Sequence, residues 1–251
     1  MRVGLIGAGN MACALARGWG DPVLCSDAGS GRALAVAQEL GGEAVGSNRA
    51  VAEKCDLVVL CHKPSALGAV AAELVGRAQA VASVLAGTSV AMLQEAYPGV
   101  PVFRLMPSIP VEVRQGVICY CRAPEVERGL EAEVLELFGR LGTVVRLEER
   151  LMEAASAVMA VGPAYQALLV EAQVDAAVRH GLGPMLAATL VVETMAGSAA
   201  LLAARGHDTL TVRREVTSPG GSTARGLQAL ERGGVRSAFQ DAIDAVLCAG
   251  R

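Results

Sequence analysis

The 251-residue chain has few aromatic residues and no block of charges of one sign. Aromatic residues make up 3% of the sequence and hydrophobic residues 53%, so alanine, valine and leucine must fill the core. The net charge of -3 argues against a general nucleic-acid binder, which would carry a basic patch. The chain is long enough for one large domain or two smaller ones, each with a sizeable core.

The sequence also lacks an uninterrupted apolar run of the roughly 18 residues that a membrane span needs. The richest stretch, residues 154–170, is interrupted by Ser156, Gly162, Pro163 and Gln166, and we expect it to be a helix buried in the protein or at a subunit interface. Glycines interrupt the apolar run after Arg2, and no cleavage-site pattern follows. We therefore expect a cytoplasmic protein without a membrane partner.

No cysteine pattern typical of a metal site or a disulfide framework is present. The 7 cysteines are irregularly spaced, and a single residue separates Cys119 from Cys121. Zinc-binding pairs usually leave about two to four residues between them. Several cysteines lie in apolar runs, where a reduced thiol behaves as a small hydrophobic group. We predict no metal site and no redox role.

The first half of the chain alternates short β-like runs with helical stretches. Strands are expected at 3–6, 23–26, 57–60, 80–85, 102–105, 116–120 and 143–147, and helices at 11–18, 31–40, 66–75, 90–96 and 125–141. This alternation predicts an α/β fold with a Rossmann-like, doubly wound parallel sheet.

The second half changes character after Glu148, where almost no β-like run remains. Helical periodicity covers residues 151–160, 163–180, 184–204 and 227–247. Pro163 and Pro184 suit the first turn of a helix. We predict a Rossmann-like dinucleotide-binding domain over residues 1–149 and an all-α domain over residues 150–251.

A glycine-rich turn follows the first expected strand. Residues 7–12 (Gly-Ala-Gly-Asn-Met-Ala) fit the pattern G-x-G-x-x-A, in which Gly7 permits a tight turn and Gly9 lets the backbone approach a pyrophosphate. The N-terminus of the next helix, at Asn10 and Met11, offers N–H groups and a positive dipole end to the phosphates. The pattern predicts a dinucleotide site.

The choice between NADH and NADPH depends on residues after the second expected strand. Asp27 lies about twenty residues past Gly7 and could bond both ribose hydroxyls, which favours NADH. Ser30 and Arg32 could instead hold the 2′-phosphate of NADPH, with Arg32 forming a charge-assisted pair. Alternatively, Arg32 is solvated and Ser30 caps the helix. The predicted cofactor is NADPH or NADH.

Five segments together resemble the pyrroline-5-carboxylate reductases and cover nearly the whole chain. The first is the glycine-rich turn with its Asn-Met pair. The others are residues 60–64, similar to the family's Val-Lys-Pro; residues 104–110, similar to Arg-Val-Met-Pro-Asn-Thr-Pro; residues 162–165 with Glu171; and the most specific, residues 216–223 (Val-Thr-Ser-Pro-Gly-Gly-Ser-Thr). The resemblance implies that the helical domain dimerises with a second copy, that dimers can assemble further, and that the active site lies between the domains and across the dimer.

The resemblance also implies an NAD(P)H-dependent oxidoreductase that reduces a small cyclic imine acid. The implied reaction converts 1-pyrroline-5-carboxylate to L-proline in proline biosynthesis. Lys63 and Pro64 follow the third expected strand, at the edge of the sheet where such folds bind ligands, and Lys63 could contact the cofactor, offset the charge of the substrate or be a solvated loop lysine. Met106 is expected to contact the cofactor at the nicotinamide. Gly162 and Pro163 are expected to break a helix close to the substrate.

The loop over residues 218–223 suits capture of the substrate carboxylate. Its glycines let successive backbone N–H groups point into one concavity, as an anion-binding nest does. The substrate-binding residues expected there are Ser218, Gly220, Gly221, Ser222 and Thr223. By resemblance, Thr223 is the catalytic hydroxyl at the ring nitrogen, which it either protonates or only orients. The alternative is an ordinary turn with Thr223 as the helix cap.

Some residues depart from the family pattern. Ser108-Ile109 replaces the usual Asn-Thr, Met159-Ala160-Val161 replaces Ser-Gly-Ser, and His62 stands outside the pattern. Loss of polar partners around a small acid could cost about 1–3 kcal/mol for each unpaired group. The alternatives are therefore a paralogous cyclic imine reductase of a specialised pathway, or a nucleotide-binding regulator without catalysis.

A second enzyme class, the β-hydroxyacid dehydrogenases and ketol-acid enzymes, shares the glycine fingerprint. These enzymes need a catalytic lysine on a C-terminal helix or a carboxylate-lined metal site. No lysine follows Glu148 in this sequence. Carboxylates are present at Glu171, Asp175 and Glu193, but the first two are as readily a solvated helix face.

Overall fold

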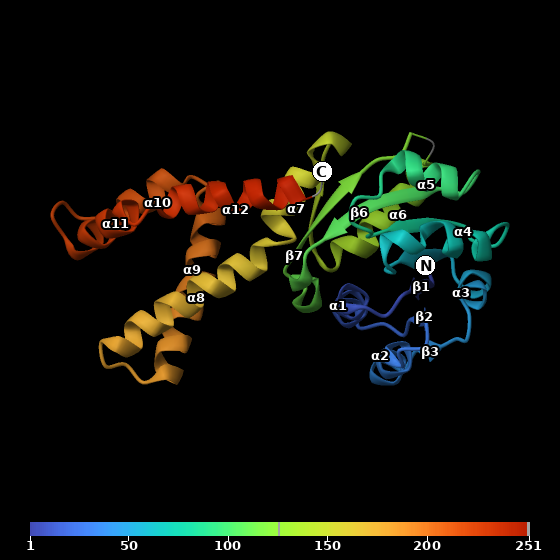
Figure 1. The fold of residues 1–251 in the computed structure, drawn as a ribbon, viewed down its shortest axis with the longest axis horizontal. Coiled ribbons are helices and arrows are strands. Elements are labelled where there is room, and N and C mark those ends of the chain that lie inside the picture. Colours follow the sequence, from blue (N-terminus) through green and yellow to red (C-terminus); the bar gives the residue numbers. More distant parts are fainter. Residues whose placement is uncertain (125, 250–251) are drawn as a thin grey trace. The chain divides into compact units, whose positions relative to one another are not determined.

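The computed structural model describes residues 1–124 and 126–249 and divides into two compact units, residues 1–163 and 164–249 (Figure 1). The first unit holds the whole sheet. The unit boundary lies between Pro163 and Ala164. The last two residues of the predicted domain 150–251 lie outside the described residues.

The sheet of the first unit has eight strands in the order β3-β2-β1-β4-β5-β6-β7-β8. The strands are β1 (Val3–Ile6), β2 (Leu24–Ser26), β3 (Glu43–Ala44), β4 (Leu57–Leu60), β5 (Val81–Ser83), β6 (Val102–Pro107), β7 (Gly116–Cys121) and β8 (Gly142–Arg146). The first six are mutually parallel, which confirms the Rossmann-like prediction. β7 is antiparallel to β6, and β8 is parallel to β7. The expectation of a parallel sheet therefore fails at β7, because the link from β6 is too short for the crossover that parallel strands need.

The first unit also contains helices and 3-10 turns. The helices are α1 (Asn10–Trp19), α2 (Arg32–Leu40), α3 (Asn48–Lys54), α4 (Leu67–Leu74), α5 (Val90–Ala96), α6 (Arg128–Gly139) and α7 (Met152–Met159), with 3-10 turns η1 (Pro64–Ala66), η2 (Ile109–Val113) and η3 (Glu149–Leu151). Helices α1 to α6 and the turns η1 and η2 lie between strands, and η3 and α7 follow the last strand. The sequence analysis missed α3 and the two-residue strand β3. The helix expected from Glu125 begins at Arg128, and Glu125 itself lies outside the described residues.

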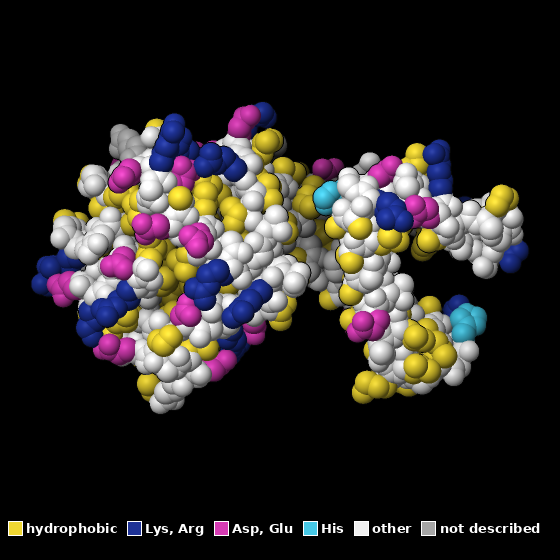
Figure 2. All heavy atoms as spheres, turned by 180° about the vertical axis from the view of Figure 1, so that it is seen from behind, with side chains coloured by type: hydrophobic (Ala, Val, Ile, Leu, Met, Phe, Trp, Pro, Cys, Tyr) yellow, Lys and Arg dark blue, Asp and Glu magenta, His cyan; other side chains and the backbone are white. Residues whose placement is uncertain are grey.

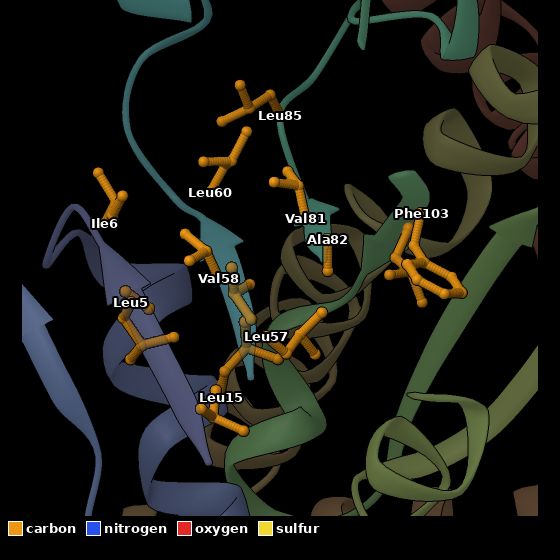
Figure 3. Packing of buried hydrophobic residues seen from close by; sticks show 14 of the residues in the cluster. Leu5, Ile6, Leu15, Leu57, Val58, Leu60, Val81, Ala82, Leu85 and Phe103 are labelled. Atoms are coloured by element: carbon orange, nitrogen blue, oxygen red, sulfur yellow. The ribbon is translucent and has the colours of Figure 1, made fainter. Parts of the chain in front are cut away.

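The core of the first unit is built from the apolar strand residues and the inner faces of the helices (Figure 3). β1, β4 and β5 are buried on both faces, which explains their continuous apolar runs. At one end of the core, the rings of Trp19 and Phe138 meet edge to face at 5.4 Å, and the Trp19 indole donates to the carbonyl of Leu137. Such pairs add to stability beyond the area that they bury.

The C-terminus of α1 is capped by Arg114, whose φ of 59° is in the left-handed region. Its Nε donates to the carbonyl of Gly18 at 2.7 Å. Gly18 itself packs against η2 so closely that a Cβ would lie 2.2 Å from the carbonyl oxygen of Val111. Helix α1 is thereby held in place on the sheet, with its N-terminus at the glycine-rich turn.

The second unit is entirely helical in its described residues. α8 (Gly162–Arg179) leads into it, followed by α9 (Pro184–Ala204), α10 (Thr209–Glu215), α11 (Ser222–Arg232) and α12 (Val235–Ala249). The single helix predicted over 227–247 is wrong. It is interrupted at Gly233-Gly234, where Gly234 adopts a φ of 75°. α10, also missed, begins at Asp208, whose carboxylate accepts the N–H groups of Leu210 and Thr211.

Helices of the second unit expose apolar side chains (Figure 2). Met185 is 81% exposed, Leu168 64% and Leu186 53%, and Ala187 alone is fully buried among the described residues of this unit. By length and composition, the segment Glu149–Arg179 and helix α9 could cross a membrane. The same properties suit helices that are covered by another protein surface.

Candidate functional site

A groove of about 750 Å³ lies at the carboxyl ends of β1, β2 and β4. This edge is where open α/β sheets bind their ligands. Several residues predicted to bind the cofactor line it together: Gly7, Gly9, Asp27, Ser30, Arg32 and Lys63. All of them belong to the first unit.

The two glycines of the turn have different structural roles. Gly7 has a φ of 95°, and a Cβ there would lie 2.8 Å from the backbone of Cys61 and His62. Gly9 is the N-cap residue of α1, with no side-chain cap, and a Cβ there would meet nothing within 4 Å. The backbone therefore requires glycine at position 7, whereas position 9 leaves open space over the N-terminus of the helix. A diphosphate fits this space.

Asp27 directs its carboxylate toward its own loop. One oxygen accepts the Ser30 hydroxyl at 2.6 Å and the N–H of Ala33 at 3.0 Å, and the other accepts the N–H of Gly29 at 2.9 Å. The hydrogen bond from Ser30, supported by those from the backbone, lowers the pKa of Asp27 to about 2. Asp27 thus stabilises the entry into α2 as a fully charged group.

Arg32 lines the same groove and forms no salt bridge with this carboxylate. Its Nη2 donates to Oδ1 of Asn10, the first residue of α1, at 2.7 Å. Within the described residues no carboxylate forms a salt bridge with Arg32. Ser30 Oγ accepts the N–H of Arg32 at 3.4 Å, although the N-cap residue of α2 is Gly31. Arg32 and Ser30 can therefore meet an anionic ligand together.

The other predicted cofactor contacts, Asn10, Met11, Pro64 and Met106, are not among the residues that line the groove. Met11 is half-buried and packs against the core, and Met106 on β6 is buried in it. Pro64 begins η1 directly after Lys63.

Some groove residues were not found from the sequence. Ser47 caps α3 by accepting the N–H of Ala50, and Asn48 accepts the Ser26 hydroxyl at 2.7 Å. Both residues lie between β3 and α3 or at the start of α3. The sequence of these two elements shows little hydrophobic periodicity, so neither element was predicted. His62 is the second residue after β4, and its position near a strand end was the available signal. Burial raises the pKa of the neighbouring Cys61 thiol to about 12.

The predicted substrate loop lies in the second unit and forms a tight turn. The N–H of Gly221 donates to the carbonyl of Ser218 at 3.1 Å, with Pro219 and then Gly220 between them. Gly220 has a φ of 67°, so this is the type II pattern of proline followed by glycine. A Cβ on Gly221 would lie 2.4 Å from Ser218 Oγ. The turn therefore favours glycine at position 220, whereas a side chain at position 221 would require the Ser218 hydroxyl to move.

Thr223 is the second residue of α11 and is exposed. The N-cap residue is Gly221, with no side-chain cap, so the alternative in which Thr223 caps the helix is wrong. The first helical hydrogen bond joins the N–H of Arg225 to the carbonyl of Gly221. The N–H groups of Ser222 and Thr223 precede it and head the helix, where they can meet an anion.

Gly162 and Pro163 occupy the first positions of α8, after α7 ends at Met159. The chain therefore breaks between helices where the sequence analysis expected it. Among the departures, Ser108 is buried, and its Oγ accepts the N–H of Val117 on β7 at 3.0 Å. The hydroxyl thus anchors the turn between β6 and β7. Ile109 is 42% exposed.

Metal-binding groups do not gather in the described part of the chain, where no three His, Cys, Asp or Glu side chains are placed to hold an ion. The cysteines of this part are free thiols. The groove offers glycine turns, hydroxyls and a guanidinium instead. Its donor set therefore suits phosphates and sugar hydroxyls, as a dinucleotide presents them.

Comparisons with known proteins agree with this geometry. Residues 149–250 match the family model "Pyrroline-5-carboxylate reductase dimerisation", and residues 2–87 match "NADP oxidoreductase coenzyme F420-dependent". Pyrroline-5-carboxylate reductase 3 of Macaca fascicularis is 34% identical, with 100% of this chain and 95% of the relative aligned. The enzyme of Synechocystis is 36% identical over 79% of this chain and 75% of its own length.

Solved structures show the same likeness. The pyrroline-5-carboxylate reductase of Streptococcus pyogenes superposes with a TM-score of 0.90 at 27% identity, covering 100% of this chain and 98% of its own. The Plasmodium falciparum pyrroline carboxylate reductase with NADP bound gives 0.86 at 26% identity, covering 100% and 97%. With the full-length relatives, these matches show that the chain belongs to the pyrroline-5-carboxylate reductase family.

Proposed function

We propose that the chain reduces 1-pyrroline-5-carboxylate to L-proline with a reduced nicotinamide dinucleotide. The observation that carries the proposal is the loop of residues 218–223, which presents an uncapped helix N-terminus next to a free hydroxyl on Thr223. A small ring acid needs both features, an anion site for its carboxylate and a polar group at its nitrogen. The cofactor supplies the hydride that adds to the imine carbon.

The protein's part in this reaction is to position the ring. The N–H groups of Ser222 and Thr223 hold the carboxylate, aided by the dipole of α11. We assign Thr223 an orienting hydrogen bond to the ring nitrogen. A threonine hydroxyl is a poor general acid, and a cyclic imine can arrive already protonated.

The test is steady-state turnover with Thr223→Ala. Loss of one well-placed hydrogen bond should lower kcat/KM by about 10- to 100-fold, corresponding to about 1.4–2.8 kcal/mol. Because Thr223 does not cap α11, the melting temperature should stay that of the wild type. Thr143→Ala, an exposed threonine on β8, is the matched control and should keep full activity.

A substrate panel separates the alternatives. Pyrroline-5-carboxylate, its six-membered homologue and substituted analogues are compared by kcat/KM. If an analogue gives the higher kcat/KM, the protein is an imine reductase of a specialised pathway. If the protein binds NADPH but reduces no imine, the remaining alternative is a nucleotide-binding regulator.

We further propose NADPH as the preferred donor. Asp27 already accepts three hydrogen bonds from residues 29–33, whereas Arg32, which also lines the groove, has no carboxylate partner among the described residues. A 2′-phosphate would pair with Arg32, and the Ser30 hydroxyl could join it by turning its hydrogen away from Asp27. A relative has been solved with NADP bound, which supports the proposal.

Arg32→Ala tests this preference. We expect kcat/KM for NADPH to fall by at least about tenfold, the effect of losing one charge-assisted hydrogen bond, with the value for NADH little changed. Arg49→Ala, which removes an exposed arginine paired with Glu53, is the control. Equal losses with both cofactors would contradict a contact to the 2′-phosphate.

A further inference from the structure

His62 is the groove residue at which this chain departs from its family. It follows β4 and stands where the family pattern Val-Lys-Pro has valine. His62 lines the groove, together with Lys63 and the glycine-rich turn. A valine could offer a ligand only apolar contact, whereas an imidazole brings two nitrogens.

The position of His62 in the sheet indicates which half of a bound dinucleotide, adenosine or nicotinamide, it can contact. β1 lies between β2 and β4 in the sheet. Asp27 ends the β2 side, where the adenosine ribose lies in such folds, and the diphosphate covers the turn after β1. The backbone nitrogen of His62 lies 2.8 Å from the place of a Cβ on Gly7, so His62 borders the turn from the β4 side. The nicotinamide half of the dinucleotide extends over that side.

The hydrogen bond of His62 to a backbone carbonyl shows which ring nitrogen carries the hydrogen. Nδ1 lies 2.8 Å from the carbonyl oxygen of Lys63. A carbonyl can only accept, so Nδ1 must carry the hydrogen. Nε2 is then a lone-pair acceptor, and it is buried without a partner among the described residues. Burial also lowers the pKa of His62, which keeps the ring neutral at physiological pH.

A buried acceptor without a donor is unfavourable and calls for a partner. We propose that Nε2 of His62 accepts a hydrogen bond from a hydroxyl of the nicotinamide-side ribose when the dinucleotide fills the groove. The phosphates are ruled out as partners, because an ionised phosphate has no hydrogen to donate to a neutral nitrogen. The inference rests on the proposed function, in that the chain must bind a nicotinamide dinucleotide.

Binding measurements on the full-length protein test the inference. NADPH is titrated by its fluorescence, and 2′,5′-ADP, which lacks the nicotinamide half, by displacement. His62→Val carries the family's residue and should raise the Kd of NADPH by about 3- to 10-fold, the range expected for one hydrogen bond. The Kd of 2′,5′-ADP should stay unchanged. His62→Gln, whose amide oxygen can replace Nε2, should bind NADPH nearly as the wild type does.

Two outcomes overturn the inference. In one, His62→Val binds NADPH as tightly as the wild type. In the other, it weakens NADPH and 2′,5′-ADP equally, which places the effect on the adenosine side or on the fold. Failure of the proposed function is distinct, since it would appear as a wild type that turns over no imine, whatever the effect of His62→Val on NADPH binding.

A measurement on the wild type covers the case in which a variant does not fold. The chain has 3 histidines, so the ring nitrogens can be assigned by nitrogen NMR. We expect a bare-acceptor signal for Nε2 of His62 that moves upfield when NADPH is added and stays in place with 2′,5′-ADP. An Nε2 signal unaffected by NADPH would overturn the inference.

Discussion

The guanidinium of Arg104 donates to Oε1 of Glu149 at 2.7 Å, and the same oxygen accepts the backbone N–H of Val90 at 2.7 Å. Arg104 is buried in the middle of β6, and Glu149 begins η3. A second carboxylate, Glu153 on α7, accepts from Arg104 at 3.1 Å. These bonds join the sheet to the segment that precedes α8.

This arrangement predicts unequal effects for the two carboxylates. Glu149→Ala would leave the buried Arg104 and the Val90 N–H each short of a partner, and should cost about 2–3 kcal/mol of unfolding free energy. Glu153 is 60% exposed in its side chain, so Glu153→Ala should cost about 1 kcal/mol or less. Urea denaturation of both variants measures the order. The reverse order would contradict the role given to Glu149.

The two glycines of the turn should separate stability from binding. Gly7→Ala places a Cβ against the Cys61–His62 backbone at a positive φ and should destabilise the fold. Gly9→Ala has open space around its Cβ, so its melting temperature should stay near the wild-type value. Its methyl group would occupy the place of the diphosphate and should raise the Kd of NADPH by at least about tenfold. If Gly9→Ala binds NADPH with unchanged affinity, the diphosphate does not bind at this turn.

The stability of the first unit should depend on pH through His62. Burial holds the pKa of this imidazole below its ordinary 6.5. The unfolded chain therefore takes up the proton first, so the stabilisation is complete above about pH 6.5 and is lost as the pH falls toward the folded pKa. As the pH falls below about 6.5, the unfolding free energy of the wild type should decrease faster than that of His62→Val. Parallel curves would show that the ring titrates normally.

Association through α8 and α9 is the prediction for the exposed apolar helices. We expect a homodimer, because residues 149–250 match a dimerisation domain and Leu190 and its apolar neighbours are exposed in one chain. Leu190→Arg should give a monomer in light scattering with little activity. Val75→Arg, at an equally apolar exposed site of the first unit, should leave the dimer intact. A dimer that survives Leu190→Arg would place the interface elsewhere.

Local signals made much of the fold predictable. The bounds of β1 and β4 were predicted correctly because each is a short apolar run that ends at a clear break, such as Gly7 after β1. The glycine-rich turn was readable for the same reason. β3 was missed because Glu43 and Ala44 have no strand pattern of their own and pair only through β2.

Long-range contacts explain what the sequence did not reveal. The groove gains Ser47 and Asn48 through α3, and the proton position on His62 depends on a carbonyl contact that no residue pattern contains. The break at Gly233-Gly234 was hidden by apolar periodicity that continues on both sides of it. The order of the strands in the sheet decides on which side of the groove each residue lies. That order is known only from the folded chain.

Ala187 is the one fully buried side chain among the described residues of the second unit. A chain segment with so little interior of its own gains most of its stability from the surface that it shares with a second copy. Its thermal midpoint should therefore rise with protein concentration, by mass action, whereas that of the first unit should not. Dilution alone would then melt the helices while the sheet stays folded.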